Sequence, residues 1–304
     1  RGAWTEIPAR PASDEEIGRI HTARYIKLIK DTAGQDRVVL DGDTSTSAGS
    51  AQAALLAAGG SIEAASAVMR GDVANAFAFV RPPGHHAEAD RAMGFCLFNN
   101  AAIAARALID ERGLKRILIV DWDLHHGNGT QNAFYETDRA LYFSIHQSPH
   151  YPGSGHWRET GRGPGEGCTL NVPLWAGKGD ADYLHVLRTI LEPAALAYKP
   201  EFVIVSAGFD IYGGDPLGGM EVTAEGFAAL TAEMMDIARE CCGGRIVHVL
   251  EGGYNGKGLK EGAKAVLDQL GGRAPRPAIA AAPSHELLSE LEPMLRLFRT
   301  LWPI

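Results

Sequence analysis

Acidic and imidazole side chains alternate in the segment DWDLHH. Asp121, Asp123 and His125 stand two positions apart, and in an extended chain such positions point to the same side. Asp210 follows a second apolar segment and would add another carboxylate. Two carboxylates and one imidazole around an open coordination position suit a catalytic zinc, ferrous iron or manganese ion, so we expect a metal here. A lone DxD pair is more often a helix cap or an ion-pair partner, but that alternative leaves the histidine and the second acidic segment unexplained.

A tandem of histidines and a tyrosine are candidates for acid–base chemistry. His85 and His86 follow Pro-Pro-Gly, a stiff turn that would hold both imidazoles in place. Neutral imidazoles beside a metal can accept a proton and return it to a leaving group. Tyr254 follows two glycines, and its phenol could donate a hydrogen bond to a developing oxyanion. The alternatives are structural: a buried histidine pair and a tyrosine in a surface loop.

Other reactive patterns in the sequence are incomplete. No serine or cysteine lies in a GxSxG turn, so a covalent acyl-enzyme route has no candidate nucleophile. The glycines at 161, 163, 165 and 167 lack the GK[ST] that would complete a phosphate-binding loop. We expect packing or surface roles for the histidines that stand apart from these motifs, which are His21, His185, His248 and His285.

The reactive residues follow short apolar runs that predict buried strands. Such continuous apolar runs are typical of strands covered on both faces, as in parallel sheets. Alanine-rich segments with helical periodicity alternate with them, which indicates an α/β fold with a mostly parallel multi-stranded sheet and helices on both faces. Because the carboxyl ends of parallel strands share one edge, the reactive residues would meet there. The predicted strands are 76–80, 116–120, 140–145, 202–206 and 245–250, and the predicted helices are 51–68, 99–111, 180–198 and 223–241.

Length alone would suggest about two domains, but α/β folds of this size often form one unit, so we expect a single domain over residues 1–304. Residues 146–179 are dense in Gly and Pro and predict a long loop at the site, since long loops in compact domains are commonly functional. Residues 271–283 are rich in Pro and Ala and predict a linker that leads into an amphipathic helix at 285–301.

The charge balance excludes some classes of partner. The net charge of −8 has the wrong sign for binding nucleic acid through its phosphates. Every apolar run is interrupted within about ten positions, short of the roughly 18 to 20 residues that span a bilayer, so we expect no membrane segment. Four irregularly spaced cysteines without a CxxC pair fit a reduced, cytoplasmic protein. Whether the chain forms an oligomer stays open.

Six motifs occur in order along the chain: RPPGHHA, GFCLFNN, DWDLHHGNGTQ, SAGFD, DPLGGM and EGGY. From about Asp14 to Leu267 the sequence resembles the zinc-dependent histone deacetylase family, above all its class II branch and the bacterial histone deacetylase-like amidohydrolases. The resemblance implies an arginase/deacetylase-like fold and zinc-dependent hydrolysis of acetamides, with ferrous iron as the alternative metal. The implied substrate is an acetyl-lysine peptide or protein, or a small N-acetylated amine.

The resemblance assigns metal-binding and catalytic roles position by position. His86 would transfer the proton, and Tyr254 would polarise the substrate carbonyl. Asp121 would accept a hydrogen bond from His85. Asn128 stands where class I relatives carry an aspartate, so the pKa of His86 should be lower than in those relatives. The residues that match zinc ligands are Asp123, His125 and Asp210.

Substrate and potassium positions follow from the same resemblance. The acyl-lysine tunnel and its rim would be formed by Gly94, Phe95, Tyr151, Leu217 and Asp43. Structural potassium would bind at an inner site made of Asp121, Asp123, His125, Ser144 and Ile145, and at an outer site near Phe134 and Thr137.

Three other functions stay open. An acetylpolyamine amidohydrolase would share the chemistry but have a different tunnel, and a Leu at 217 disfavours it because polyamine-selective relatives carry a Glu there. A dimanganese ureohydrolase of the arginase type would need further acidic ligands. A non-catalytic acetyl-lysine reader would keep the pocket without the chemistry, and the retained His85, His86 and Tyr254 argue against it.

Overall fold

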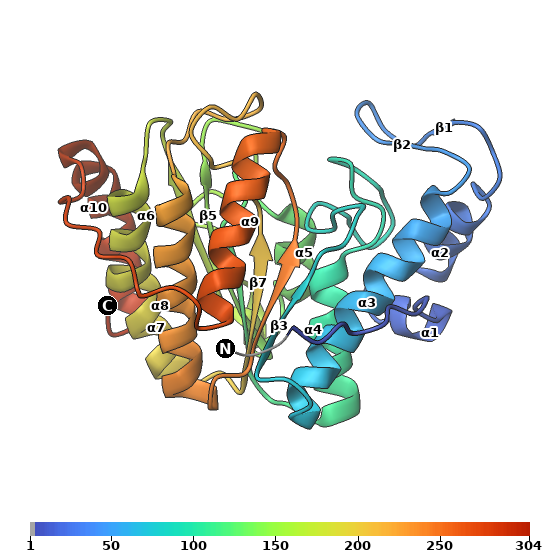
Figure 1. Cartoon of the computed structure of the whole chain (residues 1–304), viewed down its shortest axis with the longest axis horizontal. Coiled ribbons are helices and arrows are strands. Elements are labelled where there is room, and N and C mark those ends of the chain that lie inside the picture. The colour runs from blue at the N-terminus through green and yellow to red at the C-terminus, as the bar shows by residue number, and fades with distance from the viewer. Residues whose placement is uncertain (1–3) are drawn as a thin grey trace.

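The computed structural model describes residues 4–304 and has a six-stranded parallel sheet at its centre (Figure 1). The strand order is β3-β8-β7-β4-β5-β6, and each neighbouring pair in it is parallel. A separate short antiparallel pair is formed by β1 (Val38–Val39) and β2 (Ser45–Thr46). The strands of the main sheet are β3 (Asn75–Ala78), β4 (Ile117–Asp121), β5 (Ala140–Gln147), β6 (Thr169–Leu174), β7 (Phe202–Ala207) and β8 (Ile246–Leu250).

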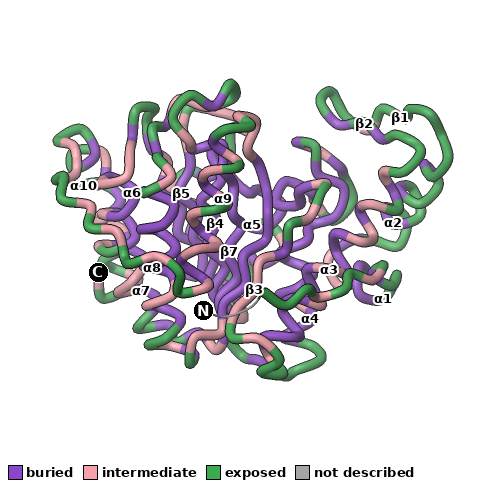
Figure 2. The backbone as a smooth tube through the Cα atoms, viewed as in Figure 1, coloured by how far each residue is buried: buried purple, intermediate pink, exposed green. Residues whose placement is uncertain are grey.

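Helices cover both faces of this sheet, which confirms the predicted fold class. Along β4, Leu118 and Val120 pack into one layer and Ile117 and Ile119 into the other, because successive side chains of a strand point to opposite faces. Each of these side chains is fully buried, and burial stabilises the fold by about 1.5–3 kcal/mol per side chain. Figure 2 shows the central strands as buried and many connecting loops as exposed. One layer contains α3 (Ser50–Arg70) and α4 (Asn100–Arg112), and the other contains α6 (Asp180–Val186), α7 (Glu192–Tyr198), α8 (Ala224–Cys242), α9 (Gly256–Leu270) and α10 (His285–Leu301).

Capping residues explain where the helices begin and end. The Thr223 side chain accepts a hydrogen bond from Gly226 N–H at the start of α8, and Gly243 ends that helix in the left-handed conformation. Ser284 caps α10, which begins and ends as predicted. The predicted helix at 180–198 is interrupted by a π-helical turn, η2 (Leu187–Leu191). The remaining short elements are α1 (Asp14–Ile17), α2 (Ala23–Lys30), α5 (Asn128–Phe134) and the 3-10 turn η1 (Gly163–Gly165).

The prediction of one long loop over residues 146–179 is wrong in part. β5 extends to Gln147, and β6 occupies residues inside the predicted loop and pairs with β5. Pro173 indicated a loop in the sequence, but β6 lies at the edge of the sheet, where one row of backbone groups needs no partner and proline is tolerated. A shorter loop therefore connects the two strands.

The direction of the connections reverses between β4 and β7, and this reversal determines where a site can lie. From β4 the chain continues to β5 and β6 on one side, whereas from β7 it continues to β8 on the other side. A crevice forms at the carboxyl ends of two such strands, and ligands bind there in open α/β sheets. Asp121, the last residue of β4, is paired with Ser206 of β7, so the segments that follow both strands meet at this crevice.

Within residues 4–304, no helix is both long enough and apolar enough to cross a bilayer.

Candidate active site

The three predicted metal ligands converge at the carboxyl ends of β4 and β7. Asp123, His125 and Asp210, here called the ligand cluster, bring potential ligand atoms within 4.8 Å of one another. His125 Nδ1 lies 3.1 Å from Asp123 Oδ1 and 3.2 Å from Asp210 Oδ2. Donor atoms about 2.0–2.2 Å from a tetrahedral ion are roughly 3.3–3.6 Å apart, so the cluster has nearly the spacing of a metal site.

One carboxylate oxygen of the ligand cluster, Asp210 Oδ2, is buried without a hydrogen-bond donor and could bind a cation. Asp123 Oδ2 accepts a hydrogen bond from Gly252 N–H at 2.8 Å, and Asp210 Oδ1 accepts one from Leu124 N–H at 2.9 Å. Within the described residues, buried Asp210 Oδ2 has no hydrogen-bond donor of normal geometry, and the imidazole of His125 lies beside it as an ion pair at 3.2 Å. A buried carboxylate oxygen without a donor is unfavourable, and a bound cation would compensate it. The donor set therefore fits a divalent metal.

The pKa values in the ligand cluster reflect crowded negative charge. Burial, together with the charge of Asp123, raises the pKa of Asp210 to about 6. Burial by itself would lower the pKa of His125, but the contacts and negative charges of Asp123 and Asp210 outweigh it and raise that pKa to about 10. Two carboxylates that compete for one imidazole proton would both be stabilised by a metal ion.

Two glycines allow the ligand cluster to form at the strand ends. A Cβ atom on Gly208 would lie 2.3 Å from Asp123 Oδ2, and one on Gly252 would lie 2.2 Å from Asp210 Oδ2. Any side chain at either position would displace a ligand carboxylate. The glycines of SAGFD and EGGY are therefore required by close approach of backbone to the ligand cluster.

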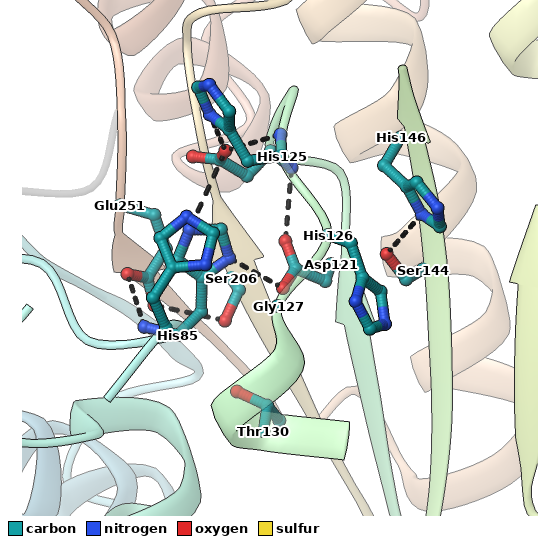
Figure 3. Close-up of polar contacts among 12 residues, drawn as sticks. His85, Asp121, His125, His126, Gly127, Thr130, Ser144, His146, Ser206 and Glu251 are labelled. Atoms are coloured by element: carbon teal, nitrogen blue, oxygen red, sulfur yellow. Dashed lines mark hydrogen bonds and ion pairs between the residues drawn. The ribbon is translucent and has the colours of Figure 1, made fainter. Parts of the chain in front are cut away.

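The tandem histidines lie beside the ligand cluster and have different partners, and Figure 3 shows His85 with Asp121. His85 Nδ1 is 3.0 Å from Asp121 Oδ2, and His86 Nδ1 is 2.8 Å from Asn128 Oδ1. Asn128 Nδ2 donates to Glu88 Oε1 at 2.5 Å, which orients the amide oxygen toward His86. Because that oxygen can only accept, Nδ1 of a neutral His86 carries the proton and Nε2 is the free base.

The surroundings of the two histidines separate their pKa values. Burial opposes the charged form of His85, but the charges of Asp123 and Asp121 outweigh burial and raise its pKa well above the usual value. Burial and the neighbouring charge of His85 lower the pKa of His86 well below the usual value. Two neighbouring titratable groups whose pKa values are shifted in opposite directions are typical of an acid–base pair. His86, with the lowered pKa, is the neutral member at pH 7.

Tyr254 and three predicted tunnel residues border the same site. The ring of Tyr254 meets the ring of Phe95 edge-on at 5.8 Å, and the ring of Tyr151 meets that of His86 edge-on at 5.1 Å. Burial raises the pKa of the Tyr254 phenol, which therefore keeps its proton and can donate a hydrogen bond. Phe95 and Leu217 are each 40% exposed, as residues at an opening would be.

The loop between β1 and β2 supports the tunnel residues from outside. Asp43 Oδ1 accepts a hydrogen bond from Gly94 N–H, and Thr44 Oγ1 accepts one from Phe95 N–H, each at 3.0 Å. Gly94 packs so closely on His86 that a Cβ atom would lie 2.2 Å from the imidazole Cδ2. Asp43 thus holds the backbone of the Gly94 loop in this structure, and a contact of Asp43 with substrate stays a prediction.

The predicted potassium residues lie along β4, β5 and α5. Asp121 stands directly beside Ser144 in the register of β4 and β5, which brings the inner group together. Ser144 Oγ is 3.0 Å from His146 Nδ1. Thr137 N–H donates to the Phe134 carbonyl at 3.2 Å, so the outer pair is joined at the end of α5.

Sequence reasoning assigned no role to the buried carboxylate of Glu251. Its Oε2 accepts hydrogen bonds from the N–H groups of Gly84 at 2.7 Å and His85 at 3.1 Å, and its Oε1 accepts one from the Ser206 hydroxyl at 3.1 Å. Burial raises the pKa of Glu251 to about 7, although the charge of His85 opposes this. Glu251 therefore fixes the turn that carries the tandem histidines. Its place in the EGGY motif was the available signal.

A second set of buried polar residues was also not predicted. His126 lies 2.8 Å from Ser154 Oγ through Nδ1 and 3.0 Å from Gln131 Oε1 through Nε2. His146 Nε2 lies 3.1 Å from the Gly155 carbonyl. These histidines fasten the loop after β5 against the sheet, and burial lowers the pKa of His126 to about 4.

Comparisons with known proteins agree with this geometry. A family model described as "Histone deacetylase domain" matches residues 2–270. A probable deacetylase of Archaeoglobus fulgidus is 44% identical over 81% of this chain and 68% of its own length. A histone deacetylase-like amidohydrolase of Pseudomonas aeruginosa is 40% identical over 87% of this chain and 70% of its own length. The crystal structure of the HDA15 HD domain has a TM-score of 0.92 and 41% identity, and the match covers 98% of this chain and 82% of that one.

Some relatives are much longer than this chain. Histone deacetylase HDA1 of Candida albicans is 40% identical over 96% of this chain, but the match covers only 36% of the Candida protein. The predicted resemblance is confirmed by the family match over residues 2–270. The chain therefore belongs to the histone deacetylase family, a family of hydrolases that act on amides.

Proposed function

We propose that this chain is a zinc-dependent deacetylase that removes acetyl groups from acetyl-lysine side chains or similar N-acetylated amines. The observation that carries the proposal is the ligand cluster, with the imidazoles of His85 and His86 beside it. Attack of water on an acetamide carbonyl requires a proton acceptor and stabilisation of the oxyanion, and both kinds of group are present.

The ligand cluster would hold the metal through Asp123, His125 and Asp210. Zinc bound there would act as a Lewis acid toward the substrate carbonyl and would lower the pKa of a water molecule. The same donors suit ferrous iron, so the native metal is one of the questions for experiment.

The proton is moved by the chain's own imidazole. His86 Nε2 accepts the proton of the attacking water, because Nδ1 is engaged with Asn128. The same nitrogen passes that proton to the amide nitrogen as the C–N bond breaks, which yields acetic acid and the free amine; the acid then gives up its proton to the amine or to solvent and leaves as acetate. The Tyr254 phenol donates a hydrogen bond to the carbonyl oxygen as negative charge develops on it. Asp121 accepts a hydrogen bond from His85 Nδ1 and so holds the His85 imidazole next to this site.

The walls of the opening favour the neutral methylene chain of acetyl-lysine. Phe95 and Leu217 offer apolar contact. A cationic polyamine would be desolvated against Leu217 without a paired charge, which is unfavourable. The proposal also includes structural potassium beside Asp121 and Ser144, supported by their register and by the family resemblance.

A substrate panel tests the proposed function. The chain is loaded with zinc, or with ferrous iron without oxygen, and is assayed on acetyl-lysine peptides and acetylspermidine at about 0.15 M salt. We expect higher kcat/KM for the peptides and loss of activity with a chelator. A preference of about tenfold or more for acetylspermidine would favour the polyamine amidohydrolase. No hydrolysis of either substrate with either metal would refute the proposal.

A further inference from the structure

The carboxylate of Asp215 joins two loops of the candidate site. Its Oδ2 accepts hydrogen bonds from the N–H groups of Tyr254 at 2.8 Å and Asn255 at 2.9 Å. Its Oδ1 accepts one from Leu217 N–H at 3.0 Å. Asp215 is only 4% exposed, so these contacts are shielded from water. One side chain thus connects the turn of the phenol with the turn of the tunnel wall.

An amide could not replace this carboxylate. Three backbone N–H groups point at its two oxygens, and both oxygens accept. In Asp215→Asn, one oxygen becomes an NH₂ group that faces at least one N–H group, and two donors cannot bond to each other. The charge of the carboxylate also strengthens each hydrogen bond.

The position of the Tyr254 phenol depends on the hydrogen bond between its backbone N–H and Asp215, because Tyr254 follows two glycines. Gly253 has a φ of +130°, a region that glycine enters easily, and this part of the chain has few intrinsic restraints. Gly252 N–H is bonded to Asp123 Oδ2 at 2.8 Å. The backbone of this turn is therefore held at Gly252 by Asp123 of the ligand cluster and at Tyr254 by Asp215.

We propose that Asp215 is a positioning residue, which sets the distance of the Tyr254 phenol from the ligand cluster and couples that phenol to the Leu217 wall. The inference rests on the proposed function, because it assumes that Tyr254 assists the hydrolysis of acetamides. Asp215 itself acts through the backbone of Tyr254 and has no contact with substrate in this role.

A double-mutant cycle on the zinc-loaded chain tests this role. We expect Asp215→Asn to lower kcat on the order of 10- to 100-fold with a smaller change in KM, as for loss of an interaction made in the transition state. In a Tyr254→Phe background, the same change should lower kcat by less than about threefold, because the phenol is already gone. Equal losses in both backgrounds would overturn the proposal.

The matched control is Asp182→Asn. Asp182 is a buried carboxylate that accepts hydrogen bonds from Gly179 N–H at 3.2 Å and Ser284 N–H at 2.7 Å, and both partners lie outside the site. The control makes the same chemical change and should leave kcat unchanged. A similar loss of kcat in the control would show a general effect on stability and would contradict the proposed role.

Hydrogen exchange gives a second measurement that needs no turnover. In Asp215→Asn, exchange of the amides near residues 254–255 and 217 should become faster, whereas Asp182→Asn should leave it unchanged. A parent chain without deacetylase activity would refute the proposed function, and unchanged exchange would separately refute the contacts of Asp215.

If Asp215→Asn does not fold, Asp215→Glu retains both acceptor oxygens and enters the same double-mutant cycle, with the same non-additivity of the kcat losses expected.

Discussion

At the scale of single residues, the ligand cluster depends on each of its members. Because the cluster has three donors, two after β4 and one after β7, removal of one leaves two ligands, which cannot hold a metal firmly. We expect His125→Ala and Asp210→Ala to lose bound metal and activity together, with metal affinity reduced by more than about 100-fold. Elemental analysis after dialysis measures this, and His185→Ala, a histidine of α6 outside the site, is the control. Full zinc occupancy in both ligand variants would reject the assignment.

The phenol of Tyr254 can be removed without disturbing the backbone contacts around it. Tyr254→Phe should fold normally and lose on the order of 10²- to 10³-fold in kcat, the usual effect of deleting one oxyanion donor. KM should change less, since the hydrogen bond strengthens as the oxyanion forms. Steady-state kinetics on an acetyl-lysine peptide measure both. Turnover within about threefold of the parent would exclude Tyr254 as the electrophilic partner.

We expect the residue at position 217 to influence which substrate is preferred. A carboxylate in its place would attract the secondary ammonium of an acetylated polyamine, so Leu217→Glu should narrow or reverse the preference for acetyl-lysine peptides. The measurement is the ratio of kcat/KM for the peptide and for acetylspermidine at about 0.15 M salt. Leu217→Gln, which is similar in size but uncharged, is the control. An unchanged ratio in Leu217→Glu would place the selectivity elsewhere.

At the scale of elements, the end of β7 must approach the end of β4 closely. A Cβ atom on Gly208 would lie 2.3 Å from Asp123 Oδ2, whereas one on Gly256, the first residue of α9, would meet no atom within 4 Å. Gly208→Ala should therefore weaken metal binding, and Gly256→Ala should not, although both replace a glycine with alanine. Isothermal titration with zinc compares the two variants. Equal zinc affinity in both would contradict the packing argument.

At the scale of the whole molecule, a buried histidine makes stability depend on pH. His248 lies on β8 between the rings of Phe77 and Trp122, and within residues 4–304 neither of its ring nitrogens has a hydrogen-bond partner. Burial lowers its pKa to about 3. Between that value and the unfolded pKa of about 6.5, only the unfolded chain binds the proton. This contribution to stability is therefore complete above about pH 6.5 and is lost as the pH falls toward 3.

Replacement of His248 isolates this effect. Between pH 7.5 and pH 5.0, the parent should lose about 2 kcal/mol more of its free energy of unfolding than His248→Leu does. Urea unfolding of both proteins at fixed zinc concentration measures the difference. The same pH dependence in His248→Leu would show that His248 does not titrate on unfolding.

Features carried by one segment could be predicted from the sequence. The strand at 116–120 and the residues Asp121, Asp123 and His125 after it are contiguous, so the apolar run and the alternation of side chains indicate both the strand and the ligands. The helix at 285–301 was predicted at its observed bounds because its amphipathic pattern is contained in one segment, and the structure shows that Ser284 caps its start. Parallel strands bring their carboxyl ends to one edge, so convergence with Asp210 followed from the same pattern.

Features that join distant segments could not be predicted in this way. β6 resembled a loop because proline and glycine are local signals, whereas its place at the edge of the sheet, where proline is tolerated, is set by the strands already paired inside it. Glu251 and Asp215 stood within recognised motifs, but their hydrogen-bond donors are 167 and 39 residues away, at Gly84 and Tyr254. A carboxylate acquires such a role only when folding excludes water and brings those N–H groups to it, which is a property of packing and not of any local pattern.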